Sequence, residues 1–520
     1  MYSTQENRGI LVNRQDPLRN CHSLLDLWKY HATATPNRCC LVYKDMPYTF
    51  RELWQNILKA GAYYASKNLQ KGDRVILKLD NSPYFFYAFY GAMVRGLIPV
   101  PLFHQSDIKR AEKIRALSGA VLVVDEDGTY GDNGHDLSNF EALPETAPYS
   151  SGEDLAFLQY TSGTTGEAKG VMLTHHNLLA NVRQMYPSGT LTKDDVFVSW
   201  LPVYHDMGLI AMTMIPLYLG AKMVLLPISP MPAAWLGAIE KYKGTFTASP
   251  DFGYRFATKF SKPNAYDISS LRFGLIAAEP VRINTVHNFE NKFNVKGVLK
   301  PSYGLAEASV GLTFWNQYRN DIKHDDKGYV AVGRAFAQVD FKILDTGNKE
   351  LPVNEPGEIL FKSPSGTQGY FRNEAATEAL FFNGYIRTGD IGYIDEEGHL
   401  YVVGRKKQLI IKGGRNICPR EVEEIVDEVL SIRQCAAIGL ESTRLDGEDI
   451  HVFIELEKKK EEDQAYLENL KTISNKAVLA QLGVRIDRFH FVPSRFIPKT
   501  FNGKIQYGKL KELAANPVLA

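Results

Sequence analysis

A short segment rich in glycine and hydroxyl side chains is the first part of the sequence that could do chemistry. Residues 161–170 read TSGTTGEAKG and contain three glycines, four hydroxyl-bearing residues and Lys169. Glycine permits close backbone approach, so such a loop can surround phosphate groups with N–H donors. It is not the GxxxxGK[ST] pattern, because Lys169 lies between Ala168 and Gly170. Taken alone, the segment is equally compatible with a linker between two strands.

Four later segments also combine charged or aromatic residues with glycine. They are Ser302-Tyr303-Gly304-Leu305-Ala306-Glu307, Arg387-Thr388-Gly389-Asp390, Gly404-Arg405-Lys406-Lys407 and Asn502-Gly503-Lys504-Ile505. Each has an ordinary interpretation by itself. Tyr303 could be core packing, Asp390 a turn residue after glycine, and Lys504 a solvated charge. The functional interpretation depends on their occurring together.

Together these segments resemble the signature motifs of the adenylate-forming superfamily, which includes acyl-CoA synthetases, fatty acyl-AMP ligases, peptide-synthetase adenylation domains and luciferases. The motifs occur in the family's order, and the resemblance runs from about residue 25 to about residue 512. It implies an enzyme that uses ATP and Mg²⁺ to convert a carboxylic acid into an acyl-adenylate and pyrophosphate. Cations and dipoles near the phosphates would offset their repulsion of the attacking carboxylate.

The resemblance implies a phosphate-binding role for Lys169 and catalytic roles for Glu307, Lys504 and His205. The 161–170 loop would hold the β- and γ-phosphates, with Lys169 as its cation, and Glu307 would hold Mg²⁺ through its carboxylate. Lys504 would contact the acyl carboxylate and the nucleotide oxygens during adenylation. His205 would line the junction of the acyl and nucleotide pockets, although a histidine at a helix start is also commonly a structural hydrogen-bonding residue.

The resemblance also implies a binding site for adenosine. Tyr303 would stack on adenine, Asp390 would accept hydrogen bonds from both ribose hydroxyls, and Arg405 would help to fix ribose or phosphate. Residues 278–280 would supply the backbone edge of the adenine slot. The implied nucleotide-binding residues are Thr161, Ser162, Gly163, Thr164, Thr165, Gly166, Lys169, Ala278, Glu279, Pro280, Ser302, Tyr303, Gly304, Asp390 and Arg405.

The acyl acceptor is the point on which the branches of the family differ. Residues 201–210, LPVYHDMGLI, and 277–282, AAEPVR, are most similar to fatty acyl-AMP ligases, which pass the acyl group to the phosphopantetheine thiol of an acyl carrier protein. However, only about 25 residues separate Glu307 from Gly333, and that spacing is near the one in CoA ligases. We therefore expect a carrier-protein acceptor and keep free CoA as the alternative.

The acyl substrate is less well defined by the sequence. Candidate pocket walls are Phe252, Gly253, Ile276 and the apolar residues after His205, which suit an alkyl chain or an aryl acid. Asp251 keeps an amino acid as a lesser alternative, because a carboxylate there could bind an amino group. An inactive binding relative and a luciferase-like oxygenase are the other classes considered. Retention of Lys169, Glu307 and Lys504 argues against the inactive relative.

The elements that must position these residues follow an α/β pattern. β-branched runs at 74–79, 120–125, 222–227, 272–280 and 296–301 alternate with helix-length stretches such as 82–96 and 233–242. This alternation predicts parallel sheets covered by helices on both faces. After about residue 330, short strands separated by glycine, proline and aspartate predict a β-subdomain and then a small α+β tail.

We expect a domain boundary at Gln408, with an N-terminal adenylation domain at 1–407 and a mobile C-terminal domain at 408–520. The tail should contain a helix with Pro419 in its first turn and one apolar face. Family members usually carry Asp or Lys at the hinge, so Gln408 departs from their pattern. The apolar face of the helix predicted to begin near Pro419 comprises Val422, Ile425, Val426, Val429 and Leu430.

Bulk composition excludes several other classes of protein. The 60 Lys and Arg residues balance 59 Asp and Glu residues, which argues against a nucleic-acid partner. The five cysteines form no CxxC pair, and the N-terminus lacks a secretory pattern, so we expect a cytoplasmic protein.

Residues 209–228 are apolar but interrupted by Pro216, Gly220 and Lys222, which predicts a helix, a turn and a buried strand, with no transmembrane segment. A monomer or homodimer is expected.

Overall fold

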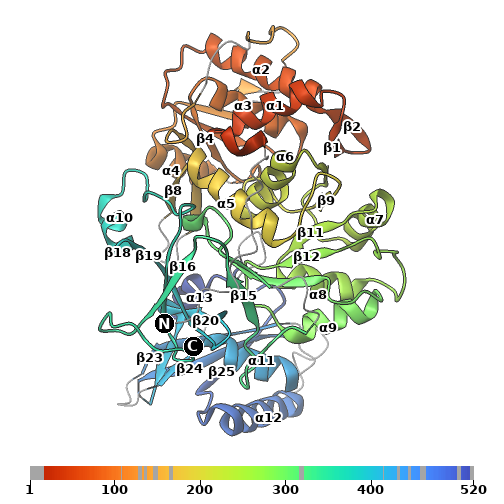
Figure 1. Ribbon diagram of the computed structural model, residues 1–520. Coiled ribbons are helices and arrows are strands. Elements are labelled where there is room, and N and C mark those ends of the chain that lie inside the picture. Colours follow the sequence, from red (N-terminus) through yellow and green to blue (C-terminus); the bar gives the residue numbers. More distant parts are fainter. Residues whose placement is uncertain are drawn as a thin grey trace.

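The parts of the chain follow one another from one end of the molecule to the other. In the computed structural model, the first helices lie at the top of Figure 1, the central strands in the middle and the elements after residue 410 at the bottom. The structure describes residues 17–106, 108–126, 132–133, 137–144, 150–162, 168–315, 321–413, 415–429, 434–442, 447–456, 464–499 and 505–515.

A 14-stranded sheet forms the centre of the N-terminal part. The half of this sheet that is built from residues 39–303 is parallel, apart from its edge strand. The burial of these short apolar strands on both faces confirms the predicted α/β class. The predicted strands at 222–227, 272–280 and 296–301 correspond to β10, β12 and β13. The parallel strands are, in spatial order, β13 (Leu299–Tyr303), β12 (Phe273–Ile276), β11 (Phe246–Ser249), β9 (Val196–Ser199), β10 (Lys222–Leu225) and β1 (Cys39–Tyr43), and β2 (Met46–Thr49) is the antiparallel edge.

Helices cover this sheet and begin at residues suited to a first turn. α5 (His175–Ser188) begins at a capping box between Thr174 and Asn177, and α7 (Pro232–Tyr242) has proline in its first turn. The apolar window at 209–228 folds as predicted. It forms a π-helix at Met207–Met214, then α6 (Ile215–Leu219), a turn at Gly220 with φ 68°, and β10. No helix among the described residues is long and apolar enough to cross a membrane.

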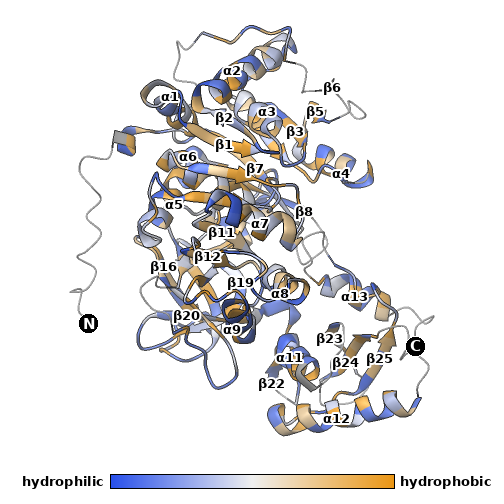
Figure 2. Cartoon of the chain, turned by 90° about the vertical axis from the view of Figure 1, so that its right-hand side faces the viewer, coloured by the Kyte–Doolittle hydropathy of each residue, from blue (hydrophilic) through white to orange (hydrophobic). Residues whose placement is uncertain are grey.

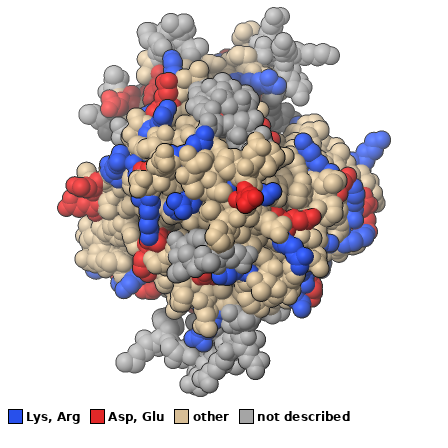
Figure 3. All heavy atoms as spheres, turned by 90° about the horizontal axis from the view of Figure 1, so that it is seen from above, with Lys and Arg blue, Asp and Glu red and all other residues tan. Residues whose placement is uncertain are grey.

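A second, smaller sheet and a hairpin lie beside the large sheet. The sheet is parallel, in the order β4, β3, β5, β6, and confirms the strands predicted at 74–79 and 120–125. Figure 3 views this end of the molecule from above and shows cations and anions interspersed on its surface. The elements of this region are α1 (Leu24–Ala34), α2 (Phe50–Ser66), β3 (Arg74–Lys78), α3 (Pro83–Val94), β4 (Ile98–Pro101), α4 (Ile108–Ser118), β5 (Leu122–Asp125), β6 (Asp132–Asn133), β7 (Leu155–Ser162) and β8 (Ala168–Thr174).

The short strands after β13 extend the large sheet in antiparallel fashion. The β-subdomain predicted after about residue 330 is therefore continuous with the central sheet through main-chain hydrogen bonds. This continuity fixes the position of the β19–β20 pair relative to β13. The elements are β14 (Thr313–Phe314), β15 (Ala331–Ala335), β16 (Asp340–Leu344), β17 (Gly357–Lys362), α10 (Glu374–Leu380), β18 (Phe381–Phe382), β19 (Tyr385–Ile394) and β20 (His399–Arg405).

The elements after Gln408 have a hydrophobic core of their own. As predicted, α11 begins at Pro419, and Val422, Ile425 and Val426 are buried in that core. Figure 2 shows hydrophobic residues on β24 and β25 and mixed colouring on α12. The elements, hereafter the C-terminal part, are β21 (Ile410–Lys412), β22 (Arg415–Ile417), α11 (Pro419–Val429), β23 (Gln434–Glu441), β24 (Glu448–Glu455), α12 (Gln464–Leu482), β25 (Arg488–Val492) and α13 (Tyr507–Ala514).

Candidate active site

The predicted phosphate-binding loop connects β7 and β8, which form an antiparallel hairpin. Thr161 pairs with Lys169, and Ser162 pairs with Ala168. Phe371 N donates a hydrogen bond to Gly170 O at 2.8 Å, so the hairpin is attached to the segment before α10. Five loop residues lie outside the described part of the chain, namely Gly163, Thr164, Thr165, Gly166 and Glu167.

Tyr370 connects the predicted loop cation to the predicted magnesium ligand. The Lys169 ammonium lies 4.8 Å from the centroid of the Tyr370 ring, and the Tyr370 hydroxyl donates to Glu307 Oε1 at 2.7 Å. Burial, followed by the neighbouring Glu307 carboxylate, raises the pKa of Tyr370, so its phenol is a proton donor at neutral pH. No sequence motif marked Tyr370, because an aromatic residue after glycine is common in ordinary cores.

Asp390 lies in a second cluster built from three strands. Its carboxylate accepts a hydrogen bond from Tyr303 Oη at 2.5 Å and pairs with Arg405 Nε at 2.7 Å. Asp390 and Arg405 are register partners on β19 and β20, while Tyr303 ends β13. The side chains predicted to bind ribose and adenine are thus in direct contact.

The Arg405 guanidinium interacts electrostatically both with Asp390 and Tyr303 and with the pair Glu307 and Tyr370. The Asp390 carboxylate is the largest cause of its raised pKa, and Tyr303, Glu307 and Tyr370 raise it further. A guanidinium surrounded by these oxygens keeps its charge and can also attract an anionic ligand. The arrangement suits a nucleotide whose ribose and phosphates lie between the clusters.

The predicted edge of the adenine slot follows β12. Ala278 has φ 69°, a left-handed conformation that is uncommon outside glycine, and the Glu279 carboxylate accepts a hydrogen bond from Phe252 N. Ser302 and Gly304 flank Tyr303. A Cβ on Gly304 would lie 1.7 Å from the carbonyl oxygen of Val310, so only glycine fits there.

His205 is at the start of the π-helix, where its alternative structural role is also visible. Its Nδ1 lies 3.0 Å from Asp206 Oδ1, which also accepts from Met207 N at 2.7 Å. The side chain is 35% exposed, so the ring can still reach a bound molecule. π-helical turns occur frequently at functional sites.

Asn81 positions the segment that carries His205, although no sequence motif pointed to this residue. This fully buried amide donates to Leu201 O and Leu226 O, both at 2.9 Å, and accepts from Val203 N at 3.0 Å. Two of these bonds join the β3–α3 connection to the segment between β9 and His205, and the third joins it to the residue after β10. Asn81 precedes Ser82 and Pro83, which from sequence indicate only a helix start.

The predicted acyl-pocket walls lie around an aromatic cluster. The Phe252 ring packs edge-on against Trp200, with centroids 6.1 Å apart, and a Cβ on Gly253 would lie 3.0 Å from the Trp200 ring. Asp251 is buried, and its oxygens accept from Arg255 Nε at 2.7 Å and Arg282 N at 3.1 Å. The chain itself uses both oxygens, which disfavours the amino-acid alternative.

The predictions for the Mg²⁺ ligand Glu307 and for the catalytic Lys504 both remain predictions. Among the described residues, no group of three or more His, Cys, Asp or Glu side chains could hold a metal by itself. A single carboxylate such as Glu307 suits Mg²⁺ whose other ligands are phosphate oxygens and water. Lys504 lies outside the described residues; next to it in sequence, Ile505 pairs with Lys499 in an isolated β-bridge.

The sequence profile of AMP-binding enzymes matches residues 28–371. The chain therefore belongs to this family, the adenylate-forming ligases, and is an ATP-binding enzyme that activates an acid by adenylation. It is 29% identical to a long-chain-fatty-acid–CoA ligase of Bacillus subtilis, over 92% of each chain. It is 31% identical to the medium-chain-fatty-acid–[acyl-carrier-protein] ligase TtuA of Teredinibacter turnerae, over 71% of this chain and 65% of that protein.

Solved structures agree with this assignment. One of the fatty acyl-adenylate ligases of E. coli and L. pneumophila superposes with a TM-score of 0.85 at 25% identity, over 95% of this chain and 97% of that one. The match covers the C-terminal part as well as the sheets that carry the candidate site. The order of the motifs in the sequence and the three-dimensional fold therefore indicate the same family.

Proposed function

We propose that this enzyme activates a fatty acid as its acyl-AMP, with release of pyrophosphate, and transfers the acyl group to the phosphopantetheine thiol of an acyl carrier protein. The convergence of Lys169, Glu307, Tyr303, Asp390 and Arg405 around one region is the observation that supports the nucleotide half of this proposal. These five residues come from strands and loops that are distant in sequence and belong to the motifs of the family.

In this proposal each group acts on a defined part of the reactants. Lys169 and the hairpin loop neutralise the departing pyrophosphate, and Asp390 orients the ribose through its hydroxyls. Glu307 would hold Mg²⁺, which supplies charge neutralisation at the phosphate oxygens. Lys504 would stabilise the negative charge where carboxylate and α-phosphate meet.

The acceptor is assigned to a carrier protein because of the residues around His205 and the segment 277–282. The carrier-protein ligase from T. turnerae supports the same choice, and the acyl-adenylate ligase structure supports the formation of a fatty acyl-adenylate. Free CoA is the second candidate. The short connection between Glu307 and β15 and the similarity to the B. subtilis CoA ligase favour it.

We also propose that residues 1–407 and 408–520 move as two domains. Gln408 ends a 3₁₀ turn at Lys406–Gln408, directly after β20, and the C-terminal part has its own core. A rotation at this turn would change which face of the C-terminal part covers the nucleotide.

One experiment tests the reaction and its acceptor. The protein is incubated with ATP, Mg²⁺ and fatty, aryl and amino acids, and pyrophosphate release is measured. A phosphopantetheinylated carrier protein or CoA is then added, and the products are identified by mass spectrometry. We expect pyrophosphate release with fatty acids and an acylated carrier. Efficient acyl-CoA formation with an inert carrier would replace our acceptor, and no release with any acid would refute the proposal.

A lysine variant tests the assignment of Lys504. We expect Lys504→Ala to lower adenylation about 100-fold while ATP binding changes less than about threefold. Lys509→Ala is the matched control, since Lys509 is an exposed lysine of α13. Unchanged adenylation by Lys504→Ala would show that the catalytic lysine is misassigned.

A further inference from the structure

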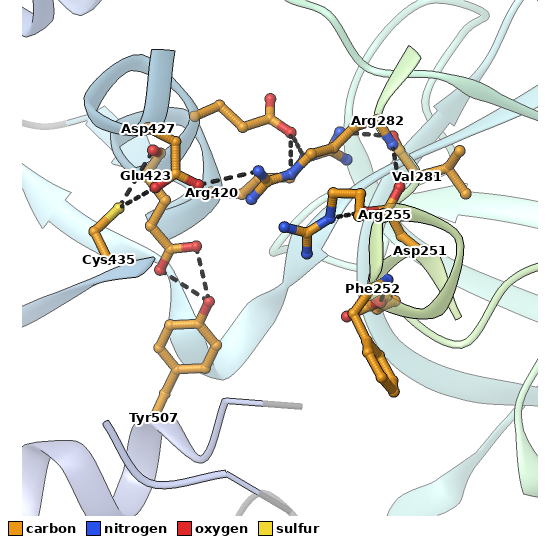
Figure 4. Close-up of polar contacts among 12 residues, drawn as sticks. Asp251, Phe252, Arg255, Val281, Arg282, Arg420, Glu423, Asp427, Cys435 and Tyr507 are labelled. Atoms are coloured by element: carbon orange, nitrogen blue, oxygen red, sulfur yellow. Dashed lines mark hydrogen bonds and ion pairs between the residues drawn. The ribbon is translucent and has the colours of Figure 1, made fainter. Parts of the chain in front are cut away.

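The segment that borders the predicted adenine slot also contacts the C-terminal part. Arg282 lies two residues after this slot, and its backbone N–H donates to buried Asp251. Its guanidinium Nη1 lies 3.0 Å from Asp427 Oδ2, and its Nε lies 3.6 Å from Glu424 Oε1. Both carboxylates belong to α11. Arg282 is therefore held by the N-terminal part through its backbone and by the C-terminal part through its side chain, as Figure 4 shows.

A second arginine makes the reciprocal contact from α11. Arg420 Nη2 donates to Val281 O at 2.7 Å, and its Nε donates to Glu424 Oε1 at 2.7 Å. The Arg420 guanidinium also lies 5.6 Å from the centroid of the Tyr329 ring, which belongs to the N-terminal part. Two consecutive residues beside the slot, Val281 and Arg282, are thus bonded to one helix of the C-terminal part.

The same helix is connected to α13 inside the C-terminal part. The Glu423 carboxylate accepts from Tyr507 Oη at 2.9 and 3.1 Å and from Ala437 N at 2.9 Å. Cys435 Sγ donates to Asp427 Oδ1 at 3.2 Å. Tyr507 is the first residue of α13, so these hydrogen bonds join α11 to the start of that helix (Figure 4).

We propose that Arg282, Asp427, Glu424 and Arg420 form an interdomain clasp that positions the C-terminal part over the nucleotide during adenylation. The clasp rests on the proposed two-step function. Its four residues are positioning residues, because they act through α11 and the segment after residue 280 and do not touch the reacting atoms. Arg282 and Asp427 are 27% and 23% exposed. Both groups remain partly exposed to solvent, which lowers the desolvation cost of opening and closing the pair.

Charge reversal tests the clasp. We expect Arg282→Glu and Asp427→Arg each to lower kcat for pyrophosphate release about tenfold, with KM for ATP changed less than about threefold. The double variant Arg282→Glu/Asp427→Arg restores the pair in reverse and should recover most of the rate. Lys241→Glu breaks an exposed ion pair with Asp45 away from the interface and is the matched control. Arg282→Gln and Asp427→Asn are milder substitutes if the reversed variants do not fold.

A second measurement separates the clasp from catalysis. Small-angle X-ray scattering of the full chain reports the arrangement of the two parts without any substrate. The single variants should give a larger radius of gyration than the wild type and the double variant. If the wild type releases no pyrophosphate but the scattering follows this pattern, the proposed function fails and the clasp stands. Wild-type rates and scattering in both single variants, or no recovery in the double variant, would overturn the clasp.

Discussion

The hydroxyl of Tyr303 donates a hydrogen bond to Asp390 over 2.5 Å, although 87 residues separate them in the sequence. Burial, and then the charge of Asp390, raises the pKa of the Tyr303 phenol well above its usual range, so the proton stays on Tyr303. The carboxylate remains an acceptor on both oxygens. The residue predicted to stack on adenine therefore orients the residue predicted to bind ribose.

The Asp390→Asn variant tests this relationship. An amide has one acceptor oxygen in place of two and carries no charge for Arg405, so the ribose and the guanidinium would both lose alignment. We expect kcat/KM for ATP in the pyrophosphate-release assay to fall about 100-fold. Tyr303→Phe keeps the ring and should cost about tenfold or less. A value for Asp390→Asn within twofold of the wild type would contradict the ribose assignment.

A glutamine at position 307 tests the magnesium assignment. Glu307→Gln keeps an acceptor for the Tyr370 hydroxyl but removes the charge that a hard cation prefers. We expect the Mg²⁺ concentration for half-maximal adenylation to rise about tenfold or more, with thermal stability nearly unchanged. Tyr370→Phe leaves the carboxylate in place and is the control. An equal shift in both variants would assign the effect to the hydrogen bond instead.

Replacement of Asn81 tests its role in holding the segment before His205. Asn81→Asp turns the two donated bonds into contacts between a buried carboxylate and carbonyl oxygens. We expect a loss of about 3 kcal/mol in the free energy of unfolding, measured with urea, and lower adenylation by the folded protein. Asn373→Asp, at the N-cap of α10, should change stability by less than about 0.5 kcal/mol. Equal losses in both variants would contradict this role.

Glu423 should make stability depend on pH. Burial raises the pKa of Glu423 from 4.5 to about 7, and it faces Tyr507, Cys435, Asp427 and the guanidinium of Arg282. Between these pH values the folded protein keeps a proton that the unfolded chain has released. The free energy of unfolding therefore falls as pH rises from about 4.5 to about 7, by up to about 3 kcal/mol from this group.

The Glu423→Gln variant isolates this contribution. The amide can still accept from Ala437 N and bond to Tyr507, but it does not titrate. We expect the urea midpoint of the variant to rise relative to the wild type as pH increases across this window. A difference that stays constant with pH would show that Glu423 does not titrate there.

The sequence alone determined the α/β class, the strands at 222–227 and 272–280, and the family. The period at which apolar residues recur along the sequence indicates whether a segment is a helix or a strand. Nucleotide binding requires particular residue types at particular spacings within each motif. The resemblance to the adenylate-forming family identified Glu307, Asp390 and Arg405 as candidate site residues. Each motif consists of residues close together in the chain, and the order of the motifs along the sequence can be read without a structure.

Only the tertiary structure decided which of these residues meet, and through what. Tyr370 joins Lys169 to Glu307, Asn81 holds residues more than a hundred positions away, and Arg282 pairs with Asp427 across 145 positions. Such contacts depend on sheet order, register and the docking of separate parts. Those properties arise from packing the whole chain, so no local pattern of residues records them.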